Sequence, residues 1–287
     1  MKNRAAKRVS VLIPTYNGRH LLEQHLPAVI DCLREADEIV IVDDCGTDTT
    51  RDYLTKKFAL IPSSAEKMWE GKVKGKHIKV TLVQTQRNLR FAGACNVGAQ
   101  VAGNELIFLL NNDVSPEKDV LQYLIPYFDE PDCFAVGCKE YEQDGSGEVS
   151  GRNLLWFERG RFMHSKARSM TSGKTAWVSG GSGLFDREKW VLLGGFDTRF
   201  YPAYWEDIDL SFRAQNKGWK VLFEEKAVVF HKHESTHVGV FGQKRIDRMS
   251  LKNGTAFIVK HATGKQYLQY LLWKPYWFVR LFKMMYL

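Results

Sequence analysis

Short apolar runs rich in β-branched residues alternate with longer stretches of helical periodicity in the first half of the chain. The apolar runs are 9–13, 38–42, 78–84 and 106–110, and the helical patterns are 21–33, 49–60, 92–102 and 120–128. Continuous apolar strands that are each followed by a helix are typical of a parallel sheet covered on both faces. The sequence therefore predicts a doubly wound α/β domain with a mostly parallel sheet.

The second half of the chain has a less regular pattern. It predicts strands at 134–138 and 221–231, a glycine-rich loop at 144–149, a strand at 175–185 interrupted by the glycine-rich stretch 180–183, and helices at 188–193 and 208–217. Gly218 is a typical residue to end the second of these helices. The lysine-rich stretch 62–79 indicates an exposed loop.

The positive charge of the chain is concentrated at its end. The 41 Lys and Arg exceed the 33 Asp and Glu by eight, and residues 244–287 alone carry nine of the basic residues and one of the acidic residues. Residues 1–243 are therefore neutral as a whole, which argues against a broad basic face for nucleic acid. We expect a body at 1–243 and a basic, aromatic segment at 244–287.

The cysteines and the apolar segments bear on the compartment. The five cysteines are odd in number and form no Cys-x-x-Cys pair, so neither a disulfide framework nor a zinc knuckle is indicated. No apolar run approaches the roughly 20 residues of a spanning helix, and the N-terminus has no cleavage site of a signal peptide. We expect a protein of the reducing cytosol that is neither secreted by a classical signal nor transmembrane.

Polar residues follow each predicted strand of the first half, where ligands bind in open α/β sheets. They lie at 14–17, 43–44, 87–88 and 111–113. The chain has no Gly-x-x-x-x-Gly-Lys loop and no Gly-x-Gly-x-x-Gly after its first strand, so phosphates would need a cation, and Asp113 is a candidate ligand for Mg²⁺ or Mn²⁺. Alternatively, Asp43 and Asp44 cap a helix, and 111–113 form a turn.

Two further clusters lie in the second half. The acids Glu206, Asp207 and Asp209 follow Tyr204 and Trp205 at the opening of a helix. A carboxylate there could be a general base, or the acids could complement the helix dipole. The histidines that follow the last predicted strand could be ligands or structural residues; they are His231, His233 and His237.

Six motifs, taken in order, resemble those of the family 2 glycosyltransferases. They are VSVLIPTYNG at 9–18, IVIVDD at 39–44, FAGACNVG at 91–98 with Asn88, LLNND at 109–113, GGFD at 194–197 and WEDIDL at 205–210. The resemblance covers about 9–237 and is closest to the branch of bacterial rhamnosyl- and galactosyltransferases. It implies a GT-A fold with a nucleotide-binding half at about 9–115, an acceptor-binding half at about 116–243, and inverting transfer from a nucleotide sugar.

The resemblance also implies a donor site and a metal site. Pro14 and Tyr16 would border the nucleobase and Asp44 would accept a hydrogen bond from it. The other donor-binding residues would be Asn88, Asn112 and Asp113. Asp113 holds the last position of the Asp-x-Asp metal motif, whose first position is Asn111 here, and this leaves strict dependence on Mg²⁺ or Mn²⁺ open. His231 would be a second metal ligand, with His233 as the fallback.

The remaining roles implied by the resemblance concern catalysis and the acceptor. Asp207 would be the catalytic base, with Glu206 as its catalytic neighbour. Gly181, Ser182 and Trp205 would contact the acceptor or its sugar.

The segment 267–287 holds eight aromatic residues and three cations among 21 residues, without an acid. Trp and Tyr favour the membrane interface, and Lys and Arg favour anionic headgroups. We expect an interfacial helix or, alternatively, a C-terminal helix that packs on the catalytic domain or on a dimer partner. Pro275 is expected to break or kink it.

Taken together, these features predict an inverting hexosyltransferase on the inner face of the cell membrane. It would move a sugar from a UDP-, dTDP- or GDP-linked donor to a hydroxyl of a glycan acceptor in cell-surface polysaccharide synthesis, and we expect this acceptor to be lipid-linked. One alternative is a sugar nucleotidyltransferase, which would need a glycine-rich loop after the first strand. Another is a non-catalytic sugar-binding or membrane-adaptor protein, against which Asp113 and Asp207 argue. The sugar, the acceptor and the oligomeric state stay open.

Overall fold

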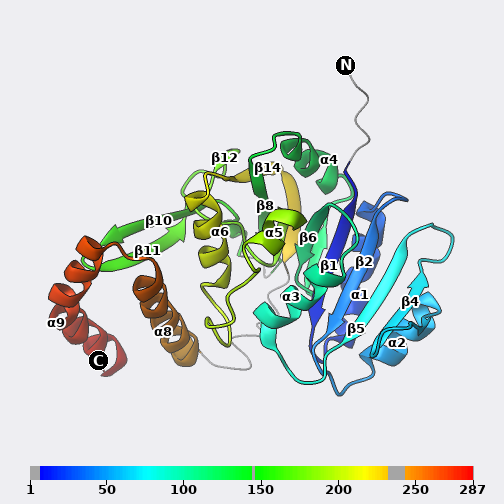
Figure 1. Ribbon diagram of the computed structural model, residues 1–287, viewed down its shortest axis with the longest axis horizontal. Helices are drawn as coiled ribbons and strands as arrows, with labels where there is room; N and C mark the ends of the chain where they lie inside the picture. The colour runs from blue at the N-terminus through cyan, green and yellow to red at the C-terminus, as the bar shows by residue number, and fades with distance from the viewer. Residues whose placement is uncertain (1–6, 144–145, 232–242, 287) are drawn as a thin grey trace.

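A mostly parallel sheet forms the centre of the computed structural model, which describes residues 7–143, 146–231 and 243–286 (Figure 1). The strand order is β12-β14-β8-β13-β6-β1-β2-β5-β4-β3. The principal strands are β1 (Val9–Thr15), β2 (Glu38–Asp43), β5 (Lys79–Gln84), β6 (Leu106–Leu110), β8 (Cys133–Glu142), β13 (Ser182–Asp186) and β14 (Lys220–His231). Strand β13 runs antiparallel to β6 and β8, whereas β1 is parallel to β2 and β6. The predicted mostly parallel sheet is confirmed.

Helices cover both faces of this sheet, as the continuous apolar strands predict. In β1, Val11 and Ile13 belong to one buried cluster, and Leu12 between them belongs to another. The first cluster includes residues of α1, α2 and α4, and the second includes residues of α3 and α6. These helices are α1 (Arg19–Cys32), α2 (Thr50–Phe58), α3 (Arg90–Val101), α4 (Val120–Leu124) and α6 (Glu206–Asn216), with the shorter α5 (Arg187–Leu192) after β13.

One predicted helix is divided in the structure. The stretch 120–128 begins as α4 and continues as the 3₁₀ helix η1 (Ile125–Asp129). Pro126 has no backbone N–H to continue the α-helical hydrogen bonding, which accounts for the change at this point.

Two predictions of irregular structure need correction. The stretch 62–79 is not a loop throughout, because β4 (Met68–Lys72) pairs antiparallel with β5, and β3 (Ile61–Pro62) pairs with β4. Lysines suit such an edge, since charged side chains protect edge strands from further pairing. The predicted strand 175–185 is wrong before Ser182, because a turn from Ser179 to Ser182 precedes β13.

A hairpin that the sequence reading missed projects from the sheet toward the C-terminal helices (Figure 1). Its strands are β10 (Asn153–Glu158) and β11 (Arg161–Lys166). Arg159 and Gly160 form its two-residue turn, both with positive φ, at 49° and 75°. A two-residue loop that ends in glycine between two alternating runs is a hairpin signal. Short pairings complete the sheet; they are β7 (Val114–Pro116), β9 (Val149–Ser150) and β12 (Gly173–Lys174).

The basic segment forms two helices, α8 (Gln243–His261) and α9 (Gly264–Tyr286). Helix α8 contributes Phe257 and Ile258 to a third buried cluster with the hairpin and the start of α6. The predicted break at Pro275 is wrong, because α9 runs through it. Leu271, whose carbonyl loses its partner, is exposed, so water can donate the missing bond. Within the described ranges, no helix combines the length and the apolar character that crossing a membrane requires.

The hairpin turn and α9 are in direct contact. A Cβ atom on Gly160 would lie 2.7 Å from Cα of Tyr270, so the backbones approach too closely for a side chain. The indole N–H of Trp277 donates a hydrogen bond to the carbonyl of Arg159 at 2.6 Å. These contacts hold α9 against the tip of the hairpin.

Gly98 allows α3 to pack closely on the sheet and supplies a test of this packing. A Cβ atom there would lie 2.0 Å from Cδ1 of Leu12 and 3.0 Å from Cγ2 of Val42, and both side chains are fully buried. We expect Gly98→Ala to lower the free energy of unfolding by about 1–3 kcal/mol through overpacking. Denaturant unfolding measures this change. Gly264→Ala is the matched control, because a Cβ atom there meets no atom within 4 Å, and an equal effect of both variants would contradict the expectation.

Candidate active site

The carboxyl ends of β1 and β2 meet through short polar contacts. Asn17, at φ 50°, uses its side-chain oxygen to accept hydrogen bonds from the backbone N–H groups of Thr47 and Asp48, at 2.6 and 3.2 Å. Tyr16 is 51% exposed beside this junction, whereas Pro14 is buried in β1. Of the two residues predicted to border a nucleobase, Tyr16 therefore offers a surface on which a base could stack.

Asp44 organises the loop that follows β5. Its Oδ1 accepts hydrogen bonds from the Thr85 hydroxyl at 2.9 Å and from the Leu89 N–H at 2.8 Å, and its Oδ2 accepts one from the Arg90 N–H at 2.8 Å. The Arg90 N–H also approaches Oδ1 of Asn88, at 3.1 Å. Both residues predicted to bind the donor thus shape the loop 85–90, and a ligand would use the remaining acceptor position of Asp44.

The turn after β6 brings Asp113 to His231. Strand β7 pairs with β14 so that Val114 is opposite His231, and this register places Oδ1 of Asp113 at 3.2 Å from Nε2 of His231. The other ring nitrogen of His231 is 3.8 Å from Oε1 of Glu142. Burial alone would lower the pKa of His231, but the bond to Asp113 and the nearby carboxylates outweigh it and raise this pKa. A metal ion would have to displace that proton.

The donor atoms at this turn fit a divalent cation that completes its shell with ligand phosphates. Asp113 and His231 supply two candidate ligands, and Mg²⁺ usually takes one or two carboxylates together with water and phosphate oxygens. In the described part of the chain, no group of three His, Cys, Asp or Glu side chains forms a complete metal site. His233 and His237 lie outside the described residues. Asn112 is held nearby, because its Nδ2 donates to the Thr15 hydroxyl at 2.8 Å.

The glycine-rich stretch before β13 lies between this turn and α6. The Asn111 N–H donates to the carbonyl of Gly181 at 2.9 Å, and a Cβ atom on Gly181 would lie 2.6 Å from the Asn111 side chain. Ser182 is buried and donates its hydroxyl hydrogen to the buried carboxylate of Glu140. Of the three residues predicted to contact the acceptor or its sugar, Ser182 therefore turns its hydroxyl inward. The sequence did not indicate Glu140, because this acid follows Lys139 beyond the apolar run that predicted the strand at 134–138.

Helix α6 begins from a strained backbone. Tyr204 and Trp205 have φ of 75° and 80°, a left-handed conformation that is costly for bulky residues and is found mainly at functional sites. Asn253 of α8 holds it, because its Nδ2 donates to the carbonyls of Ala203 and Tyr204 at 2.9 and 3.0 Å. This conformation places Glu206 and Asp207 in the first turn of α6.

The two acids of this turn differ in their surroundings. Glu206 is buried, and its Oε2 has no hydrogen-bond partner in the described residues. Asp207 is half-buried and accepts hydrogen bonds from the N–H groups of Ile208, at 2.8 Å, and Gly180. Burial raises the pKa of both acids, and in Glu206 the neighbouring charge of Asp207 adds to it. Asp207 is the acid that stays accessible, is stabilised as an anion by N–H donors, and so fits a base.

Asp209, the third acid of the motif, has a structural role. It is fully buried, and its oxygens lie 2.7 Å from Nε of Arg213 and 2.6 Å from both Nζ of Lys260 and Nε2 of His261. Burial would raise the pKa of Asp209, but the hydrogen bond from His261 and the surrounding cations lower it overall. This carboxylate ties α8 to α6.

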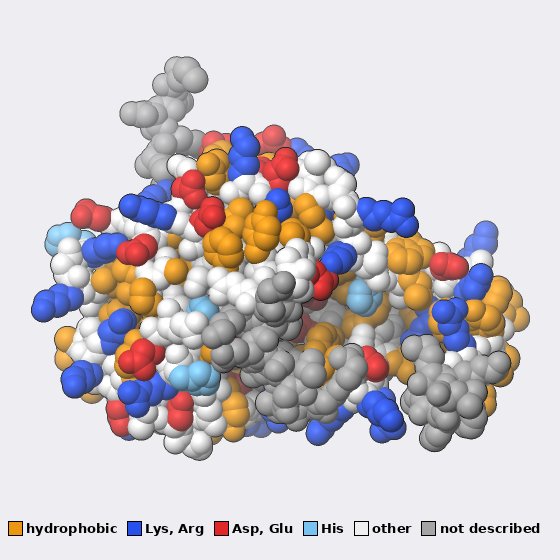
Figure 2. Space-filling model, turned by 180° about the vertical axis from the view of Figure 1, so that it is seen from behind, with side chains coloured by type: hydrophobic (Ala, Val, Ile, Leu, Met, Phe, Trp, Pro, Cys, Tyr) orange, Lys and Arg blue, Asp and Glu red, His pale blue; other side chains and the backbone are white. Residues whose placement is uncertain are grey.

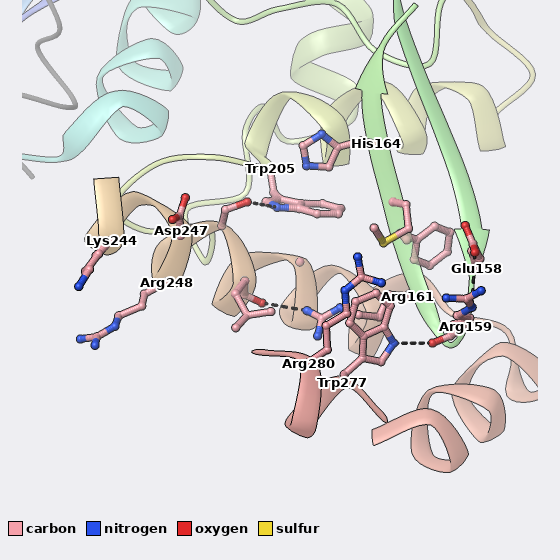
Figure 3. A pocket seen from close by; sticks show the side chains of 15 residues that line it. Glu158, Arg159, Arg161, His164, Trp205, Lys244, Asp247, Arg248, Trp277 and Arg280 are labelled. Carbon is pink, nitrogen blue, oxygen red and sulfur yellow. Dashed lines mark hydrogen bonds and ion pairs between the residues drawn. The ribbon is translucent and has the colours of Figure 1, made fainter. Parts of the chain in front are cut away.

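Trp205 points away from the sheet into a cavity of about 920 Å³ between the hairpin, α8 and α9 (Figure 3). His164 of β11 packs edge-on against the Trp205 ring, with the two ring centroids 5.0 Å apart. The indole N–H of Trp205 donates a hydrogen bond to the Ser250 hydroxyl at 3.3 Å. Trp205 thus lines a cavity that the sequence did not reveal, and its predicted contact with the acceptor or its sugar stays a prediction.

Sequence comparison agrees with this arrangement. The model of "Glycosyl transferase family 2" matches residues 10–190, and that of "Glycosyl transferase family group 2" matches residues 106–287. The chain belongs to glycosyl transferase family 2. The family match includes the strand ends around Tyr16, Asp44 and Asp113, and the second match includes Asp207 and His231.

Individual relatives share part or most of this glycosyl transferase chain. It is 31% identical over 140 residues to the putative teichuronic acid biosynthesis glycosyltransferase TuaG of Bacillus subtilis, which covers 48% of this chain and 49% of TuaG. It is 23% identical over 234 residues to the O-antigen chain rhamnosyltransferase RfbN of Salmonella typhimurium, which covers 80% of this chain and 68% of RfbN. The chain thus spans about half the length of the first relative.

A solved structure shows the fold of this glycosyl transferase to be GT-A. The mannosyltransferase PcManGT from Pyrobaculum calidifontis, in complex with GDP-Man and Mn²⁺, superposes with a TM-score of 0.63 at 21% identity and covers 94% of this chain and 70% of its own. The predicted GT-A fold is confirmed.

The buried ion pairs of Asp209 supply a stability test. We expect Asp209→Asn to lower the free energy of unfolding by about 3–5 kcal/mol, because the change leaves buried cations without their counter-charge. The lowered pKa of Asp209 means that the stabilisation is present at neutral pH and is lost as pH falls through that pKa. Denaturant titration at pH 7 measures the effect. Asp31→Asn, an exposed acid of α1, should change stability by less than about 0.5 kcal/mol; equal losses would contradict this role of Asp209.

Proposed function

We propose that the protein is an inverting glycosyltransferase that moves a sugar from a nucleotide-sugar donor to a hydroxyl of a glycan acceptor. The observation that carries this proposal is the Asp207 carboxylate, which is half-buried and held by the N–H groups of Ile208 and Gly180. The glycine-rich stretch that holds it also contacts Asn111, at the start of the proposed donor and metal turn. A base and a diphosphate site are thereby joined by one short segment.

In the proposed reaction, Asp207 takes the proton of the acceptor hydroxyl while the oxygen of that hydroxyl attacks the anomeric carbon. Attack comes from the face opposite the diphosphate, so a new C–O bond forms as the bond to the diphosphate breaks, and the configuration inverts. Asp113 and His231 would hold a divalent cation, which would supply positive charge to offset the charge of the departing diphosphate. Tyr16 and Asp44 would hold the nucleobase, and Asn88 and Asn112 would line the donor site.

The names of related proteins support the donor and acceptor classes. Solved neighbours include complexes with UDP, with UDP-GlcNAc and with GDP-Man. Curated relatives are named for teichuronic acid, O-antigen and poly-β-1,6-N-acetyl-D-glucosamine synthesis. We propose a UDP-, dTDP- or GDP-linked donor and a lipid-linked glycan acceptor in cell-surface polysaccharide synthesis.

The exposed face of α9 supports a place on the inner face of the cell membrane. Its large apolar side chains recur at helical spacing and are exposed by 39–73%; they are Tyr267, Leu268, Leu271, Leu272, Trp273, Phe278 and Val279. Lys265, Lys274 and Arg280 lie on the same helix. Figure 2 shows hydrophobic side chains beside Lys and Arg at the end of the molecule that carries α9, at the right. Such a mixture is typical of an interfacial helix.

The catalytic role of Asp207 can be tested by substitution. We expect Asp207→Asn to lower the rate of sugar transfer by about 10²–10⁴-fold, because the amide cannot accept the proton. Burial raises the pKa of Asp207 to about 6, so transfer by the wild type should fall as pH drops below that value, where the base becomes protonated. Both effects are measured with an acceptor mixture as substrate, by monitoring the nucleoside diphosphate that is released on transfer.

The matched control is Glu188→Gln, which removes an exposed acid from the first turn of α5. It should transfer sugar at the wild-type rate, while Asp207→Asn should still bind the nucleotide sugar. Transfer at the wild-type rate by Asp207→Asn would refute the assignment of the base, and binding without any turnover by the wild type would favour a non-catalytic sugar-binding protein.

Membrane binding has a separate test on exposed residues. We expect the double variant Leu272→Glu and Val279→Glu to lose about tenfold or more of its binding to anionic vesicles, because two apolar side chains no longer enter the interface. Vesicle co-sedimentation measures it. Leu192→Glu, which changes an equally exposed leucine of α5, should bind as the wild type does. Unchanged binding of the double variant would refute the interfacial role of α9.

A further inference from the structure

The cavity beside Trp205 has aromatic walls and an excess of positive charge. It lies between β11, the first turns of α8 and the middle of α9, and Trp205, Trp277 and Phe162 contribute rings to it (Figure 3). Its charged lining consists of the cations Arg159, Arg161, Lys244, Arg248 and Arg280 and the acids Glu158 and Asp247. A cavity with this lining is suited to an anion that is attached to an apolar or sugar group.

Most of these cations have no counter-charge among the residues that the structure describes. Arg159 lies 3.6 Å from Glu158. Within the described residues, no carboxylate lies within 4 Å of Arg161, Arg280, Lys244 or Arg248. Two of them share one ring, because Arg161 and Arg280 lie over Trp277 with their guanidinium carbons 5.4 and 5.7 Å from its centroid. Two cations therefore contact one ring of the cavity wall, and this concentrates positive charge there.

Arg161 is the most informative of the four. It is half-buried on β11, and its hydrogen bonds run only to the carbonyl of Leu251 and the hydroxyl of Thr255, at 3.4 Å each. Burial lowers the pKa of Arg161 and is not offset by any acid. Because removing an unpaired cation from water is unfavourable, this geometry fits a site whose ligand supplies the charge.

The position of the cavity indicates which anion this is. One wall is α9, whose Trp277 and Arg280 line the cavity and whose Leu268 and Leu272 are exposed to the outside. The opposite wall is Trp205, the residue before the catalytic pair of acids. The cavity therefore lies between the surface that we place on the membrane and the proposed base.

We propose that this cavity binds the phosphoryl headgroup of a membrane lipid, with the acceptor sugar attached to that group extending along Trp205 toward Asp207. This inference rests on the proposed function and specifies its acceptor class. A planar guanidinium group can donate two parallel hydrogen bonds to phosphoryl oxygens. Arg161 and Arg280, which both contact the Trp277 ring, are suited to this role. The phosphoryl group would belong to a lipid diphosphate that carries the acceptor sugar; an anionic phospholipid of the bilayer offers the same charge without an acceptor sugar, and the test separates the two.

The test measures binding rather than turnover. Calorimetry on the full chain, without donor, would use a C15 prenyl diphosphate, with the C15 prenyl alcohol as the uncharged comparison. We expect the diphosphate to bind and the alcohol to bind at least about tenfold more weakly. Arg161→Gln should weaken binding of the diphosphate by about tenfold or more. Lys252→Gln, an exposed cation of α8 outside the cavity, should leave it unchanged.

Exposed cations keep the proposal testable if Arg161→Gln fails to fold. Arg248→Gln and Arg280→Gln change exposed side chains and should weaken the diphosphate in the same way. Vesicles of phosphatidylcholine with phosphatidylglycerol distinguish the two sources: displacement of the prenyl diphosphate by these vesicles would overturn the assignment to a lipid diphosphate, and no displacement supports it. Binding of the diphosphate that is unchanged in all three variants, or equal binding of the alcohol, would overturn the proposal.

Hydrolysis of the nucleotide sugar distinguishes a failure of the proposed function from a failure of the proposed cavity ligand. Slow hydrolysis of the nucleotide sugar by water requires the donor site and Asp207 but not the cavity. Hydrolysis at the wild-type rate in Arg280→Gln with weakened prenyl diphosphate binding supports the proposal. Absence of hydrolysis in the wild type across donors would instead count against the glycosyltransferase assignment, whatever the cavity binds.

Discussion

The buried carboxylate of Asp209 is the interaction on which the C-terminal part of the molecule depends. This carboxylate accepts hydrogen bonds from Arg213 of its own helix and from Lys260 and His261 of α8. Arg213 in turn donates to the carbonyls of Leu193 and Gly195, at 2.6 and 2.7 Å. One acid thus fixes two helices and the loop after α5 relative to one another.

The docking of α8 has a direct effect on the first turn of α6, which carries the proposed base. Asn253, two helical turns before Lys260, is the residue that bonds to the carbonyls of Ala203 and Tyr204. The left-handed backbone before Glu206 is therefore maintained by a helix that lies outside the central sheet. This explains how a bulky Trp205 is kept in a conformation that favours glycine. A helix that appears from its charge to be an appendage therefore supports the backbone that positions Glu206 and Asp207.

The sequence predicted those parts of the fold whose cause is local. Strands β1, β2, β5 and β6 are continuous apolar runs because both of their faces are buried, and Asp113 could be singled out because it follows β6 directly. The structural role of Asp209 depends on a contact with Lys260, 51 residues away, and no spacing rule gives such a pair. The sequence pattern also could not decide between a C-terminal segment that packs on the domain and an interfacial one. In the structure α8 is packed, whereas the described side chains of α9 are largely exposed.

The two-residue turn at Arg159 and Gly160 has a consequence for the size of the cavity beside Trp205. Its backbone touches α9 at Tyr270, and its carbonyl receives the indole hydrogen of Trp277. The hairpin therefore acts as a spacer whose length sets the separation of the cavity walls. One residue more would push α9 outward and widen the cavity, and a side chain at Gly160 would do the same. Selection for a larger or smaller acceptor could thus act on a turn that bears none of the catalytic groups.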